Sequence, residues 1–165
     1  YIKHMVKNKI NEENLSDFAT ELIFISQDFI REKNGISSVS LREINRFNIF
    51  YEFFIKYLNI RKETIKKEKQ KENEKVKYQN LTDYEIKIFA INLSIYLGYY
   101  LRLTDIDENK NINNEGGLRE ILFKKLNKKF EEKNKLNFLF IPEREENFIA
   151  DNVELEKGIA KNRAY

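Results

Sequence analysis

The chain has 165 residues, 41% hydrophobic and 35% charged, so it is long enough and apolar enough to bury a core. It contains no Cys and one His, which excludes disulfides, thiolate zinc sites and sites that need several His side chains. The net charge of +3 comes from 30 basic and 27 acidic residues, and such a mixed surface predicts no nucleic acid partner.

The first residues, YIKHMVKNKI, lack the apolar stretch of a signal peptide and do not begin with Met. The last residues, AKNRAY, carry no closing signal for a helix or domain. We therefore expect a piece cut from a longer polypeptide. The absence of Cys permits a reducing compartment, and we expect a cytoplasmic location.

The first predicted helix spans residues 15–33, where apolar residues recur every three or four positions. Gly35 is placed to end it. The second predicted helix begins at Ser40, because Ser40 and Glu43 form an S-x-x-E capping box. Its many Phe and Tyr side chains, between residues 47 and 58, form a wide aromatic face that needs cover from more than one neighbour.

Residues 61–80 form a charged insert of Lys, Glu, Gln and Asn, either a solvated extension of the second helix or a disordered segment. A third helix is predicted for residues 82–103, again opened by a capping box, here Thr82 and Glu85. That run is long enough to cross a membrane, but Lys87, Asn92 and Arg102 favour a buried central helix and no membrane span.

Residues 105–117 place Asp105, Asp107 and Asn109 at the first ligand positions of a calcium loop. Lys110 stands where Gly is needed and Gly116 where the bidentate Glu is needed, so we interpret the segment as a polar loop. A fourth helix is predicted for residues 118–132, and residues 138–141 are a candidate short strand. Together these elements predict an all-α fold, a bundle of four to five helices.

Motifs for catalysis are absent from the sequence. No G-x-x-x-x-G-K-[ST], G-x-G-x-x-G or G-x-S-x-G occurs, and the carboxylate pairs sit in solvated charge runs. The chain is therefore not expected to be an enzyme on its own.

Two stretches together resemble a known family. Ser26-Gln27 is followed by VSLREINR at residues 39–46, and GIAKNRAY closes the chain at residues 158–165. Both are similar to segments of mysterin-type giant proteins, which carry tandem AAA+ ATPase modules and, in animals, a RING-type ubiquitin ligase. The family has Asp where Glu43 stands and Leu where Tyr165 stands.

The resemblance implies that residues 1–60 are a helical lid of one module and residues 136–165 a linker into the next. Residues 81–135, outside the resembling stretches, are expected to form a helical hairpin-like continuation. Arg42 would be the sensor-2 arginine that reaches the phosphates of ATP, with Arg46 its neighbour or substitute. Gly158, Ile159 and Ala160 would lie near the adenine of the following module. ATP and Mg²⁺ would be bound by the parent protein and not by this chain alone. The partners would be adjacent modules of the same chain, and any protein substrate would be met through the parent.

Plainer interpretations stand beside these. Arg42 could form an ion pair with Glu43 or Asp28, and residues 158–160 could be an ordinary helix start. The chain could also be an independent helical interaction module, with its aromatic faces packed on a partner. A nucleic acid binder using the Lys-rich insert is the least favoured, because acidic residues nearly cancel the basic ones.

Overall fold

The computed structural model describes residues 2–68, 82–103 and 117–133. These residues contain α1 (Ile2–Lys7), α2 (Glu13–Asn34), α3 (Leu41–Glu68), α5 (Asp83–Gly98) and α6 (Leu118–Lys133). Two short 3-10 turns, η1 (Ile36–Ser38) and η3 (Tyr100–Arg102), follow α2 and α5. The predicted all-α bundle is confirmed: the described part of the chain holds five α-helices and no strand.

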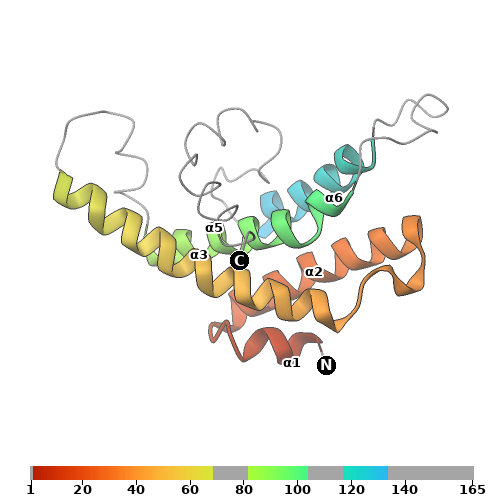
Figure 1. Cartoon of the computed structure of the whole chain (residues 1–165), viewed down its shortest axis with the longest axis horizontal. Coiled ribbons are helices and arrows are strands. Elements are labelled where there is room, and N and C mark those ends of the chain that lie inside the picture. Colours follow the sequence, from red (N-terminus) through yellow and green to blue (C-terminus); the bar gives the residue numbers. More distant parts are fainter. Residues whose placement is uncertain (1, 69–81, 104–116, 134–165) are drawn as a thin grey trace, which may run out of the picture.

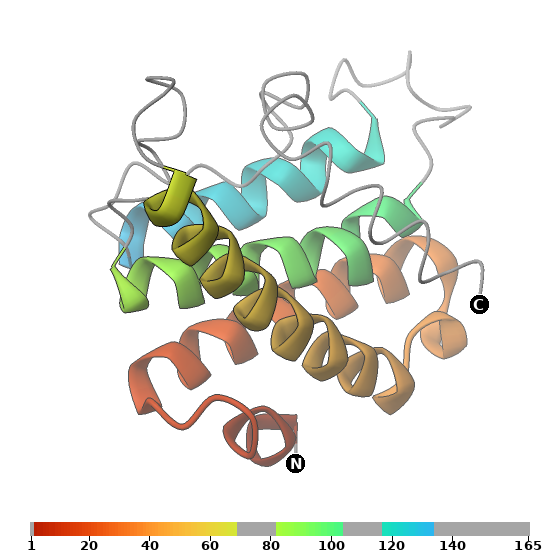
Figure 2. The ribbon, with the colours of Figure 1, turned by 60° about the vertical axis from the view of Figure 1, so that its left-hand side comes forward.

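Figure 1 shows α3 crossing in front of α5, and this is the most extensive helix contact among the described residues. α2 packs against α1, α5 and α6. In both Figure 1 and Figure 2, α1 and α6 lie on opposite sides of the layer formed by α2, α3 and α5. The bundle therefore has α5 near its centre.

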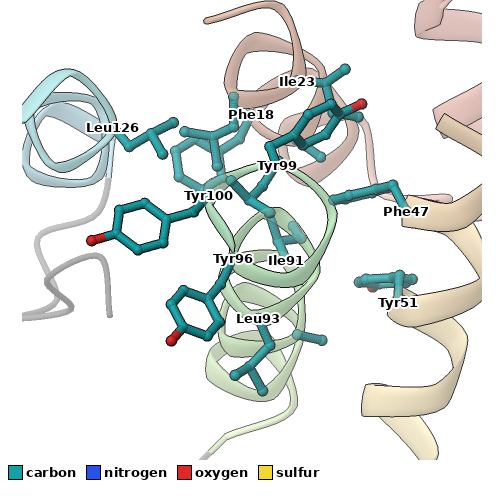
Figure 3. Packing of buried hydrophobic residues seen from close by; sticks show 14 of the residues in the cluster. Phe18, Ile23, Phe47, Tyr51, Ile91, Leu93, Tyr96, Tyr99, Tyr100 and Leu126 are labelled. Atoms are coloured by element: carbon teal, nitrogen blue, oxygen red, sulfur yellow. The ribbon is translucent and has the colours of Figure 1, made fainter. Parts of the chain in front are cut away.

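α5 is buried nearly all round, as its apolar sequence predicts. Figure 3 shows Phe47 and Tyr51 of α3 on one side of it and Leu126 of α6 on the other. Phe18 of α2 meets Phe130 of α6 edge to face, with ring centroids 5.0 Å apart. Each such buried side chain contributes about 1.5–3 kcal/mol relative to an exposed one.

One helix and two helix boundaries differ from the sequence-based expectations. The sequence pattern does not predict α1, because a six-residue helix is too short to show a period; Val6 alone in it is fully buried. The helix expected to reach residue 103 ends at Gly98, where the backbone tightens into η3. α3 continues past residue 60 to Glu68, so residues 61–68 of the charged segment are a helix extension.

Several expectations lie outside the described residues. These are the strand at 138–141, the polar loop at 105–116, the linker from 136, and the group Gly158, Ile159 and Ala160.

Candidate functional site

The candidate site is the junction where α2 ends, α3 begins and η3 follows α5. α2 ends at Asn34 and is capped by Gly35, whose φ of 100° lies in a region that favours glycine. The chain then turns through η1 and re-enters helix at Leu41. This turn sets the position of the first residues of α3.

The Ser40–Glu43 capping box is present. The Ser40 N–H donates to Glu43 Oε2 at 2.6 Å, and the Arg42 N–H donates to Ser40 Oγ at 3.3 Å. The Glu43 side chain is 8% exposed, which is unusual for a first-turn acid. Its second oxygen, Oε1, accepts from Arg102 Nη1 of η3 at 2.9 Å.

Arg102 also donates from Nη2 to the Ser38 carbonyl at 2.9 Å. One guanidinium thus connects η3 to both η1 and the first turn of α3. Burial of the Glu43 carboxylate opposes its ionisation, but hydrogen bonds from Ser40, its own N–H and Arg102 outweigh that effect. They hold the pKa of Glu43 below its usual range.

Gln27 completes the junction from α2. Its Nε2 donates to the Tyr99 hydroxyl at 3.0 Å and to the Ser40 carbonyl at 3.4 Å, while its Oε1 accepts from Arg31 Nη2 at 3.2 Å. Gln27 and Tyr99 are fully buried, and burial raises the pKa of the Tyr99 hydroxyl above its ordinary value. We call Gln27, Ser40, Glu43, Tyr99 and Arg102 the polar junction.

Two residues of the family-like motif therefore have internal roles. Gln27 is bonded within the polar junction, and the Ser26 hydroxyl donates to the Leu22 carbonyl of its own helix at 2.8 Å. Both side chains are buried, and neither faces solvent where a ligand would approach.

The predicted phosphate-binding residues lie elsewhere. Arg42 and Arg46 are exposed, one turn apart on the outer side of α3. Neither guanidinium forms an ion pair with another residue of the described ranges. The two partners suggested for Arg42 are Glu43 and Asp28. Glu43 is instead paired with Arg102, and Asp28 Oδ1 lies 3.9 Å from Arg31 Nη1. Both plainer pairings for Arg42 are absent among the described residues.

Tyr99 and Arg102 are junction residues that the sequence patterns do not predict. A signal is nevertheless present in the sequence: Arg102 is the lone charged residue in the run from Ile88 to Leu103. A single charge at the end of a buried helix needs a partner, and the capping-box Glu43 is an acid with one oxygen to spare.

In the described part of the chain, no group of three or more His, Asp or Glu side chains is placed to hold a metal ion. Across the same ranges, no helix combines the length and the apolar character needed to cross a membrane.

No protein-family model matches the chain, and no curated protein or solved structure matches it either.

Proposed function

We propose that this chain is a helical lid and linker of a tandem AAA+ ATPase similar to mysterin, in which Arg42 contacts the phosphates of bound ATP. The observation that carries the proposal is the direction of two neighbouring side chains. Glu43 turns inward to Arg102, whereas Arg42, one residue earlier, is exposed beside Arg46. A solvent-facing arginine pair on a rigid helix suits an anion that arrives from outside.

The polar junction supports this role. It fixes the first turn of α3 to α2 and to η3, so the backbone of Arg42 moves with the whole bundle. ATP with Mg²⁺ would supply the phosphate charge when bound by the parent protein. Arg42 would offset that charge, and Arg46 would add to the positive potential beside it.

The test begins with the reading frame beyond Tyr165. A G-x-x-x-x-G-K-[ST] sequence within about thirty residues is expected, since the resembling phrase at residues 158–165 would precede a phosphate loop. A stop codon, or a continuation without that loop, contradicts the proposal.

The second step is ATPase activity in the parent protein. Arg42→Ala should lower turnover by roughly tenfold to a hundredfold, as loss of a phosphate-facing arginine does. Lys56→Ala is the matched control, because Lys56 is also exposed on α3 and is not near the first turn. Equal effects of the two variants argue against a phosphate role for Arg42.

A second candidate is a helical interaction module. It is favoured by exposed apolar side chains on the outer side of α3, where Ile49 is 63% exposed and Ile60 is 65% exposed.

A further inference from the structure

The outer side of α3 has a regular pattern, of which the lid role uses only the first two residues, Arg42 and Arg46. The inner side is buried through residues such as Ile44, Phe47, Phe54 and Leu58. On the opposite side, positions alternate by four and three residues, which is the heptad spacing of a helix that packs on another helix. These positions are Arg42, Arg46, Ile49, Phe53, Lys56, Ile60 and Glu63.

We call these seven positions the outer seam. Figure 2 shows α3 crossing the front of the molecule with α5 behind it. Ile49 and Ile60 are more than half exposed, and Phe53 is half-buried. Two exposed isoleucines, three turns apart on one line, are an apolar strip that water solvates poorly.

We propose that the outer seam pairs with the outer seam of a second copy of this chain, with the two α3 helices antiparallel. The inference does not depend on a phosphate role for Arg42, because the pairing needs no nucleotide.

The charges of the seam decide the direction of the pair. A parallel pair would place each residue opposite itself, so Arg46 would face Arg46, Lys56 would face Lys56 and Glu63 would face Glu63. Like charges at such positions oppose association. The parallel arrangement is therefore disfavoured.

An antiparallel pair has one register that removes the conflicts at Arg46, Lys56 and Glu63, while Arg42 falls opposite residue 67, a Lys in the last turn of α3. With Ile49 opposite Ile60 of the second copy, Arg46 lies opposite Glu63 and Phe53 lies opposite Lys56. The two-fold symmetry repeats each pairing, so the interface has two Ile–Ile contacts and two Arg–Glu pairs. The Lys56 stem and ammonium can also pack on the Phe53 ring.

The strip is small, so the dimer should be weak and reversible. The average molar mass of the sample should therefore rise as the protein concentration increases over roughly 10–500 µM. Sedimentation equilibrium of the 165-residue chain without nucleotide measures this directly. A monomer throughout that range overturns the proposal.

A charge exchange tests the register. Arg46→Glu creates two Glu–Glu contacts, and Glu63→Arg creates two Arg–Arg contacts. Each single variant should weaken association by roughly tenfold to thirtyfold. An equimolar mixture of the two should associate like the wild type. Each heterodimer then keeps the natural Arg46–Glu63 pair at one end, and at the other end the introduced glutamate faces the introduced arginine. The double variant should also recover.

The controls use exposed positions. Lys128→Glu makes the same change of charge on α6, away from the seam, and should leave association unchanged. Ile49→Asp should abolish the dimer while circular dichroism shows a folded chain, since Ile49 takes no part in the core. Association that survives Ile49→Asp, or single variants that the mixture does not rescue, overturns the proposed pairing.

The outcome is separable from that of the lid proposal. Loss of ATPase activity in the parent Arg42→Ala variant tests the lid role, whereas the Arg46–Glu63 exchange tests self-association of the chain.

Discussion

The first turns of α3 and α5 begin with the same kind of capping box but differ in their surroundings. In α5, the Glu85 N–H donates to Thr82 Oγ1 at 3.2 Å, the Thr82 hydroxyl donates to Glu85 Oε1 at 3.2 Å, and the box is largely exposed. In α3, the equivalent acid, Glu43, is buried and also accepts from Arg102 of η3. One box caps a helix, and the other also joins three segments.

The neighbours of each box account for the difference. Lys87, near the start of α5, pairs with Glu12 at the start of α2, and both side chains remain substantially exposed. In the Glu43–Arg102 pair the guanidinium is exposed to a similar extent, but the Glu43 carboxylate is buried, with its side chain 8% exposed. Because burial strengthens electrostatic interactions and makes an unpaired charge costly, the same motif should contribute much more at α3 than at α5.

The largest expected effect is that of Glu43→Ala. It leaves the Ser40 N–H without its acceptor and deprives the partly buried Arg102 of its carboxylate, although Ser40 Oγ still accepts the Arg42 N–H. We expect the free energy of unfolding to fall by about 2–4 kcal/mol. Urea denaturation followed by circular dichroism measures it.

The matched control for this change is Arg42→Ala, one residue earlier. Arg42 is exposed and its side chain forms no bond with the described residues, so the expected change is within about 0.5 kcal/mol. Similar losses for the two variants would mean that burial of Glu43 is not what stabilises the junction.

A smaller effect should appear in the pH dependence of stability. The folded-state pKa of Glu43 is depressed, so its stabilising contribution is present above the ordinary Glu value, about 4.3, and is lost as the pH falls through the folded pKa. Glu43→Gln removes this titration while keeping the side-chain shape.

Thermal unfolding between about pH 7 and about pH 3 is the measurement, because this range spans the titration of a carboxylate. The gap in melting temperature between wild type and Glu43→Gln should narrow on acidification. The pKa of Glu52 is also lowered, by its hydrogen bond with Lys9. Because Glu52 is present in both proteins, its contribution to the pH dependence cancels in the difference between them. A gap that stays constant with pH would falsify the assignment of a depressed pKa to Glu43.

Sequence periodicity predicts much of the fold because each long helix carries its own local signals. The apolar seam of α2, both capping boxes and the apolar run of α5 are readable from residues a few positions apart. α1 cannot be predicted in this way. Its position depends on contacts with distant helices, such as the Asn48 amide that donates to the Met5 carbonyl at 3.3 Å.

The candidate site is only half predictable for a similar reason. The capping box identifies Glu43 as a helix-start residue, but not as a buried partner of Arg102, 59 residues later. The opening of η3 at Tyr100, two residues before Arg102, depends on where α5 stops, and an apolar run does not specify its own end. Exposure of Arg42 also depends on which side of α3 meets α5, which is a tertiary property.

The smallest expected effect completes the comparison of the two capping boxes. Glu85→Ala removes the same type of side chain as Glu43→Ala, but from an exposed first turn where Thr82 Oγ1 still accepts the backbone N–H of residue 85. The expected loss is about 0.5 kcal/mol, roughly fourfold or more below that of Glu43→Ala. Urea denaturation of the two variants under identical conditions gives the ratio of their losses in free energy of unfolding. If Glu85→Ala costs as much as Glu43→Ala, the capping geometry alone accounts for both, and the link from Glu43 to Arg102 adds nothing to stability.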